Sequence, residues 1–147
     1  MKKKVLLVTL LVVAIVASCF AFTACNKNKG DGDKGVKVAM ITDYGDITDQ
    51  SFNQTTWEAV VAFGKDNNVQ TKYYKPTTND TAGRVASTEL AIAEGYNVIV
   101  MPGYAFGATV AEVAEKNEKV TFVALDVSQG DLGADYTIPG NVATFVY

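Results

Sequence analysis

The sequence predicts an α/β fold in which a parallel sheet carries helices on both faces. Apolar segments of strand length alternate along the chain with amphipathic segments of about 12 to 15 residues, a pattern typical of βαβ units. Most of the strand segments are continuously apolar, as expected for strands buried on both faces of a parallel sheet. Right-handed crossovers then place the connecting helices on both sides of the sheet.

The N-terminal residues predict export rather than a folded element. Met1–Lys4 is basic, and Val5–Ala17 is an apolar run that is too short to span a bilayer. We therefore interpret residues 1–24 as a signal peptide. Residues 25–35 are rich in Gly, Asn, Lys and Asp and predict a flexible tether. We expect the folded part to be residues 36–147.

Within this folded part, hydrophobic periodicity predicts five strands and three long helices. The expected strands are 36–42, 69–74, 97–101, 120–125 and 141–147. The expected apolar helix stripes are Phe52, Thr56, Ala59, Val60 and Phe63, then Ala82, Val85, Ala86, Leu90 and Ala93, and then Phe106, Val110, Val113 and Ala114. The alternating, lysine-bearing 69–74 segment fits an edge strand. Thr-Thr-Asn-Asp after Pro76 supplies candidate N-caps for the second helix, which Gly95 ends.

Charge and composition exclude several classes of function. The chain has a net charge of −3, and removal of residues 1–24 leaves ten basic against sixteen acidic residues, a net of −6. Such an acidic domain is a poor candidate for nucleic-acid binding. The chain has no histidine and no cysteine after Cys25, which removes His-dependent catalysis and His or Cys metal sites from the folded part. No dinucleotide fingerprint, Walker loop or nucleophile elbow occurs, so we expect no cofactor.

Distinctive polar residues follow three of the predicted strands. Asp43 ends the first strand, "MPGYAF" with Gly103 ends the third, and Asp126 ends the fourth. Ligands of open parallel sheets bind outside the carboxyl ends of the strands, so these residues are expected at one crevice. The carboxylates can accept hydrogen bonds from hydroxyl or N–H groups. Asn53 offers both a donor and an acceptor, and Phe52 offers a flat apolar face for stacking.

Each of these features also has a purely structural interpretation. Asp49 or Ser51 can be explained as a helix N-cap without any contact to a ligand. Phe52 begins the apolar stripe of its helix, and Phe106 fits the core face of another helix, so each is a core residue or a ligand contact. Trp57 lies off the main stripe, and we favour packing over ligand contact.

Several segments together resemble a known family. A signal peptide, "VAMITDYGDITDQSFNQTTWEA", "GYNVIVMPGYAF" and "VTFVALD" resemble the basic membrane protein family of bacterial lipoproteins, and the resemblance covers Val36–Tyr147. It implies the first lobe of a type I periplasmic-binding-protein-like fold. It also implies a non-enzymatic receptor that binds purine nucleosides such as guanosine, inosine and adenosine for an ABC importer permease.

The resemblance also implies roles for individual residues. Phe52 would stack on the purine, Asp43 and Asn53 would hydrogen-bond near the base, and Asp126 would hold the ribose hydroxyls. The Pro102–Phe106 loop, with Gly103 and Phe106, would line the crevice. Because such receptors have two lobes in roughly twice this length, we expect residues 36–147 to be a truncated product that lacks the second lobe.

The cysteines lie where such lipoproteins carry a lipid-acceptor cysteine. "VASC", ending at Cys19, fits the small-residue box better, whereas "FTAC", ending at Cys25, directly precedes the polar tether. We favour Cys25 over Cys19, and over a Cys19–Cys25 disulfide. The expected location is the extracytoplasmic face of the cell membrane, with a lipid anchor.

Three other functions stay open at this point. The first is a receptor of the same fold for a sugar or another small polar metabolite, because acidic loops and an aromatic ring suit pyranoses too. The second is a flavodoxin-like or hydrolase-type enzyme, which would need a nucleophile and base or a cofactor loop. The third is a structural or adhesive surface lipoprotein.

Overall fold

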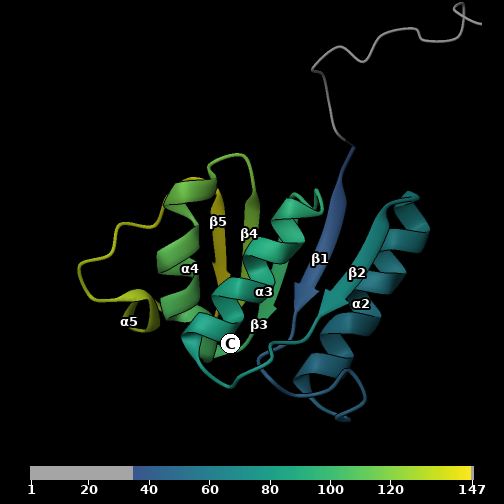
Figure 1. The fold of residues 1–147 in the computed structure, drawn as a ribbon, viewed down its shortest axis with the longest axis horizontal. Coiled ribbons are helices and arrows are strands. Elements are labelled where there is room, and N and C mark those ends of the chain that lie inside the picture. The colour runs from purple at the N-terminus through teal and green to yellow at the C-terminus, as the bar shows by residue number, and fades with distance from the viewer. Residues whose placement is uncertain (1–34, 147) are drawn as a thin grey trace, which may run out of the picture. The chain divides into compact units, whose positions relative to one another are not determined.

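Five parallel strands form the expected sheet (Figure 1). The structure is a computed structural model that describes residues 35–146, so the predicted signal peptide, Cys19, Cys25 and residues 25–34 of the tether lie outside the described residues. The strands are β1 (Lys37–Ile41), β2 (Gln70–Tyr74), β3 (Val98–Pro102), β4 (Thr121–Leu125) and β5 (Val142–Phe145). Their order is β2-β1-β3-β4-β5, and every pair is parallel. The 69–74 segment is therefore an edge strand, as predicted.

Helices connect consecutive strands. The α-helices are α2 (Phe52–Asn67), α3 (Thr81–Ala93), α4 (Gly107–Val113) and α5 (Gln129–Leu132), and two 3-10 turns are η1 (Tyr104–Phe106) and η2 (Glu115–Asn117). The periodicity did not predict α5, because a helix of four residues is too short to show a repeat. Among residues 35–146, no helix is both long and apolar enough to cross a membrane.

The helices lie on both faces of the sheet. Helix α2 packs against β1, β2 and β3, whereas α3 and α4 pack on the opposite face and contact each other, with α5 against α4. Successive strand residues point to opposite faces. Val38 and Met40 of β1 accordingly belong to the cluster beneath α2, and Ala39 and Ile41 belong to the larger cluster beneath α3 and α4.

The two faces are covered unequally. On the α3–α4 face, Ile99, Met101 and Phe122 have no solvent-exposed surface. On the α2 face, Val123 and Leu125 of β4 are only partly buried, because α2 is the one helix of the described chain on that side. This uneven cover leaves an apolar groove beside α2.

The predicted apolar stripe of α3 was wrong except at Val85. Leu90 is 52% exposed, and the helix instead buries Gly83, Arg84, Thr88 and Ala91. Hydrogen bonds allow polar residues to be buried on this face. The Arg84 side chain donates to the Asp43 carbonyl at the sheet edge, and the Thr88 hydroxyl donates to the Arg84 carbonyl at 2.8 Å. Counting apolar residues cannot detect a face that is buried through hydrogen bonds.

The observed ends of the helices agree better with the ends predicted from the sequence. Asp80 from the Thr-Thr-Asn-Asp run accepts the Gly83 N–H at 2.7 Å and caps α3. Gly95, with φ +89°, follows its C-terminus. Ser51 stands at the N-cap position of α2 but forms no side-chain cap, and Asp49 accepts the N–H groups of Ser51 and Gln54 instead.

Candidate functional site

The polar residues selected from the sequence lie at the carboxyl edge of three neighbouring strands. Strands β1, β3 and β4 are adjacent and parallel, so the residues that follow them, Asp43, Gly103 and Asp126, lie along the same edge. With the order 2-1-3-4-5, the strand order reverses between β1 and β3, which is where open α/β sheets bind ligands. The connections after β1 and β3 lead to helices on opposite faces of the sheet.

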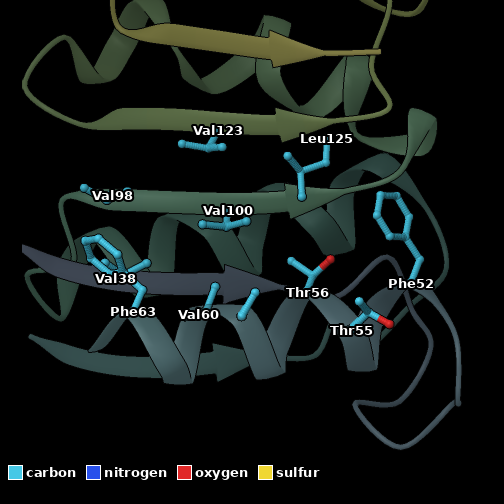
Figure 2. Close-up of a pocket in the computed structure, with 11 residues that line it drawn as sticks. Val38, Phe52, Thr55, Thr56, Val60, Phe63, Val98, Val100, Val123 and Leu125 are labelled. Carbon is cyan, nitrogen blue, oxygen red and sulfur yellow. The ribbon is translucent and has the colours of Figure 1, made fainter. Parts of the chain in front are cut away.

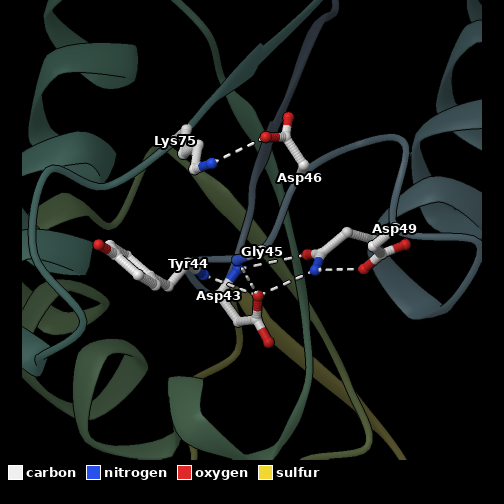
Figure 3. A network of polar contacts seen from close by, with 7 residues as sticks. Asp43, Tyr44, Gly45, Asp46, Asp49 and Lys75 are labelled. Atoms are coloured by element: carbon white, nitrogen blue, oxygen red, sulfur yellow. Dashed lines mark hydrogen bonds and ion pairs between the residues drawn. The ribbon is translucent and has the colours of Figure 1, made fainter.

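At the end of β1, Asp43 is held by a network of hydrogen bonds (Figure 3). Its Oδ1 atom accepts the N–H groups of Tyr44 and Gly45, each at 2.7 Å, and a side-chain N–H of Asn53 at 2.9 Å. Asn53 donates its second amide hydrogen to Asp49 Oδ2 at 2.9 Å and accepts the Asp43 N–H at 3.3 Å. One buried amide thus joins the loop after β1 to the start of α2.

The network sets the charge of this end of the sheet. Burial would raise the pKa of Asp43, but hydrogen bonds from Gly45, the Asn53 amide and Tyr44 outweigh it and hold that pKa below its ordinary value of 3.8. Burial also opposes ionisation of Asp49, yet bonds from Asn53, Ser51 and Gln54 lower its pKa as well. Both carboxylates are therefore ionised at neutral pH, and the edge offers hydrogen-bond acceptors.

Phe52, which precedes Asn53 at the start of α2, lines the apolar groove beside that helix. The groove has a volume of about 430 Å³ and runs over β3 and β4. Figure 2 shows Phe52 at the end of the groove toward the carboxyl ends of the strands, with Phe63 at the other end. The predicted stripe residues Thr56, Ala59 and Val60 also line it. The Phe52 ring is partly exposed and does not belong to either core cluster.

At the end of β4, Asp126 has an unusual backbone conformation. Its φ is +56°, in the left-handed region that non-glycine residues seldom adopt. The Asp126 N–H donates to the Phe145 carbonyl at 2.6 Å, whereas its carboxylate forms no hydrogen bond or ion pair within residues 35–146. Strained backbone of this kind concentrates at functional sites. Asp126 is partly exposed and presents a free acceptor at the edge.

The loop after β3 places its aromatic residues differently from expectation. Gly103 has φ +116°, and its N–H donates to the Leu125 carbonyl at 2.8 Å, which joins the ends of β3 and β4. The Phe106 side chain is completely buried in the core. The expectation that Phe106 lines the crevice is therefore wrong for its ring, because the η1 turn directs the ring inward beneath α3 and α4. Tyr104, 71% exposed, is the aromatic residue at the surface of this loop.

Sequence reasoning missed Arg84, which the structure brings to the same edge. Its side chain is only 7% exposed. One terminal nitrogen donates to the Asp43 carbonyl at 3.1 Å and to Asn79 Oδ1 at 3.3 Å, and the guanidinium lies 5.9 Å from the centroid of the Phe106 ring. A single arginine among the mostly apolar residues of α3 gives no pattern that could have indicated this role.

One remaining prediction concerns Trp57. Trp57 packs edge-on against Tyr73, with ring centroids 5.3 Å apart, so the packing interpretation is confirmed. Within the described part of the chain, no group of three or more acidic, cysteine or histidine side chains is arranged to hold a metal ion. At this edge, the Asp43 and Asp126 carboxylates can accept hydrogen bonds, and Tyr104 presents exposed aromatic surface.

Comparison with known proteins places this geometry in context. Residues 36–147 match the family described as "ABC transporter substrate-binding protein PnrA-like". The chain is 29% identical over 133 residues to the ABC transporter nucleoside-binding protein BmpA of Lactococcus lactis subsp. cremoris, covering 86% of this chain and 37% of that protein. It is 31% identical over 122 residues to the CD4+ T-cell-stimulating antigen of Listeria innocua, covering 76% and 34%.

A solved structure supports the same fold. An ABC transporter solute-binding protein from Aeropyrum pernix K1 superimposes with a TM-score of 0.64 at 19% identity, over 76% of this chain and 28% of that one. The chain thus spans about a third of the length of the curated relatives that it matches.

Proposed function

The chain belongs to the PnrA-like family of ABC transporter substrate-binding proteins, and on that premise we propose that it binds purine nucleosides at the carboxyl edge of its sheet and delivers them to an importer permease. The proposed role is recognition rather than catalysis. The observation that carries the proposal is the ionised carboxylate of Asp43, fixed at the switch point of the sheet, with the partly exposed Phe52 at the start of the helix that follows the same loop.

The arrangement of the edge suits a two-part ligand. Neighbouring strands lie about 4.8 Å apart, so the ends of β1 and β4 are separated by about 10 Å, roughly the length of a nucleoside. Phe52 would stack on the base, Asp43 would accept a base N–H, and Asp126 would accept ribose hydroxyls. Gly103 lies between them without a side chain, which lets a ligand approach the backbone.

The choice of nucleoside over other small solutes also draws on one relative. The Lactococcus lactis protein is named as nucleoside-binding, and the match covers most of the present chain. A sugar receptor would use the same carboxylates and aromatic ring, so the name of this relative is what favours a nucleoside over a sugar.

Export and anchoring form part of the proposed function. Three relatives from Pyrococcus species are named as lipoproteins. We expect Cys25 to carry the lipid, because the polar tether begins directly after it. A diacylated cysteine supplies enough buried hydrocarbon for a stable anchor at the extracytoplasmic face. Mass spectrometry of the mature N-terminal peptide tests this, and a peptide beginning at Cys19 or an unmodified Cys25 would contradict it.

The binding proposal is tested with a panel of ligands. The full chain, solubilised in detergent micelles, is titrated with inosine, guanosine, adenosine, hypoxanthine and ribose while NMR chemical shifts are followed. One stacked ring contributes about 1–3 kcal/mol, short of the roughly 4 kcal/mol of millimolar binding, so we expect dissociation constants of several millimolar or weaker.

The ranking of the ligands decides between the candidates. Nucleosides should bind more tightly than hypoxanthine, and ribose should bind weakest. If ribose binds as well as inosine, the sugar receptor replaces the nucleoside receptor. Micromolar binding of a nucleoside would show that this edge alone encloses more of the ligand than we expect.

A further inference from the structure

The side chain of Asn53 has no free donor for a ligand. Both of its amide hydrogens are donated, one to Asp43 and one to Asp49, each over 2.9 Å. Its oxygen accepts the Asp43 N–H, and the residue is only 4% exposed. An asparagine side chain has two donor hydrogens, so none remains for a bound molecule.

Both backbone groups of Asp43, its N–H and its carbonyl, form hydrogen bonds to other side chains. Its N–H donates to Asn53, and its carbonyl accepts from Arg84 at 3.1 Å. Carboxylate Oδ1 accepts three hydrogen bonds, whereas Oδ2 takes part in none within residues 35–146. The carboxylate is therefore held in one orientation, with a single oxygen left for another molecule.

From this geometry we infer that Asn53 is a positioning residue, which orients the Asp43 carboxylate so that Oδ2 alone receives the ligand, and which does not contact the ligand itself. The inference rests on the proposed function for the identity of the ligand. It revises the role implied by the family resemblance, in which Asn53 itself would hydrogen-bond near the base.

Gly45 provides independent support for this inference. A Cβ atom at position 45 would lie 2.5 Å from Asn53 Nδ2 and 3.1 Å from Asp43 Oδ1. The backbone of Gly45 does not have a positive φ, so glycine is required here by lack of space and not by conformation. The Asn53 amide and the Asp43 carboxylate thus fill the volume that a side chain would need, and a single methyl group can displace them.

The charged groups around Asp43 are Asp49, Arg84 and the Asp46–Lys75 ion pair. Asp49 is the nearest like charge and raises the pKa of Asp43, whereas the Arg84 guanidinium from α3 approaches through the Asp43 carbonyl. Asp46, on the same loop, is paired with Lys75 at 2.9 Å. Removing the Asn53 amide would leave the Asp43 and Asp49 carboxylates without the donor they share. The pKa of Asp43 should therefore rise.

The test uses carbon-detected NMR titration of the Asp43 carboxyl group in the full chain in detergent micelles. The wild-type midpoint should lie below 3.8. It should rise toward the ordinary value in Asn53→Ala and in Gly45→Ala, which keeps every donor but displaces the amide. Gly140→Ala is the matched control, because a Cβ there meets nothing within 4 Å, and its midpoint should equal that of the wild type.

Ligand titration completes the test. Inosine should bind Asn53→Ala and Gly45→Ala about tenfold more weakly than the wild type, since a charged hydrogen bond contributes about 1.5 kcal/mol or more. Gly140→Ala should bind as the wild type does. If Asn53→Ala does not fold, Gly45→Ala alone decides.

Two results would overturn the inference: an unchanged Asp43 midpoint in the variants that fold, or a nuclear Overhauser contact between inosine and the Asn53 amide protons. If no ligand of the panel shifts any signal of the wild type, the proposed function fails, while the carboxyl titration still decides whether Asn53 holds Asp43.

Discussion

The ends of β1 and β4 lie at the same edge of the sheet but are built in opposite ways. Asp43 after β1 has one carboxylate oxygen fixed by three donors, and its backbone carbonyl accepts a hydrogen bond from Arg84. Asp126 after β4 has a left-handed backbone, and its carboxylate has no partner within the described chain. The β1 end is therefore formed before any ligand arrives, whereas the β4 end retains strain and an acceptor that a ligand can use.

This difference means that residues at the two ends should respond differently to substitution. At the β1 end, stability and binding depend on the same hydrogen bonds, so a change in the Asp43–Asn53 network damages both. At the β4 end, the conformation needed for binding opposes stability, so the two properties should separate. The following predictions test that separation, in order of decreasing effect.

Replacing Asn53 should produce the largest change in stability. Asn53→Ala leaves two carboxylates and the Asp43 N–H without the amide that joins them, and we expect the free energy of unfolding to fall by about 3 kcal/mol. Urea denaturation measures this fall. Asn67→Ala on the exposed end of the same helix is the control and should cost less than about 1 kcal/mol. Equal losses in the two variants would mean that the network does not stabilise the β1 end.

Phe52 should affect binding more than stability. Its ring is partly exposed at the end of the groove, so Phe52→Ala should remove a stacking contribution of about 1–3 kcal/mol from inosine binding. NMR titration gives the affinity, and urea denaturation gives the stability. A lower free energy of unfolding with unchanged inosine affinity would assign Phe52 to the groove and not to the ligand site.

Asp126→Gly should raise stability while it weakens nucleoside binding. Glycine adopts φ +56° without steric cost, so the free energy of unfolding should increase by about 1 kcal/mol. The same variant loses the carboxylate, so inosine should lose its advantage over hypoxanthine in the ligand titration. Equal weakening of the two ligands would contradict the assignment of Asp126 to the ribose.

Acidification should have the smallest effect, and it should act at the β1 end. A carboxyl group whose pKa is lower in the folded state stabilises that state above its unfolded pKa. That stability is lost as the pH falls through the folded value, so the contribution of Asp43 should disappear below pH 3.8. Urea midpoints between pH 5 and pH 2.5 test this, and Asp43→Asn should show a shallower loss than the wild type.

The sequence predicted the sheet well because strand burial follows directly from apolar composition. The apolar strand segments and the buried stripe of Val110, Val113 and Ala114 depend on apolar residues alone, and the edge position of 69–74 follows from its alternating, lysine-bearing pattern. The shared edge of Asp43 and Asp126 also follows, since parallel strands end on the same side.

What the sequence could not supply depends on contacts between distant segments. The burial of Arg84 in α3 is stabilised by the Asp43 carbonyl, 41 residues earlier in the chain. The stripe of α2 faces a groove and leaves Phe63 48% exposed, because the other apolar side of that groove comes from β3 and β4. Whether Asn53 meets a ligand or another side chain is likewise decided by the loop geometry around Gly45 and not by residue type.

The most direct test of the nucleoside site is to locate inosine on the labelled chain. At saturating inosine, we expect the largest chemical-shift changes and intermolecular contacts at Phe52, Gly103 and Asp126, together with the Gly45 amide. The opposite edge, at Asn68 and Gly95, should not respond. Inosine contacts confined to Phe63 and Val98, at the far end of the groove, would contradict the claim that the ends of β1 and β4 form the ligand site.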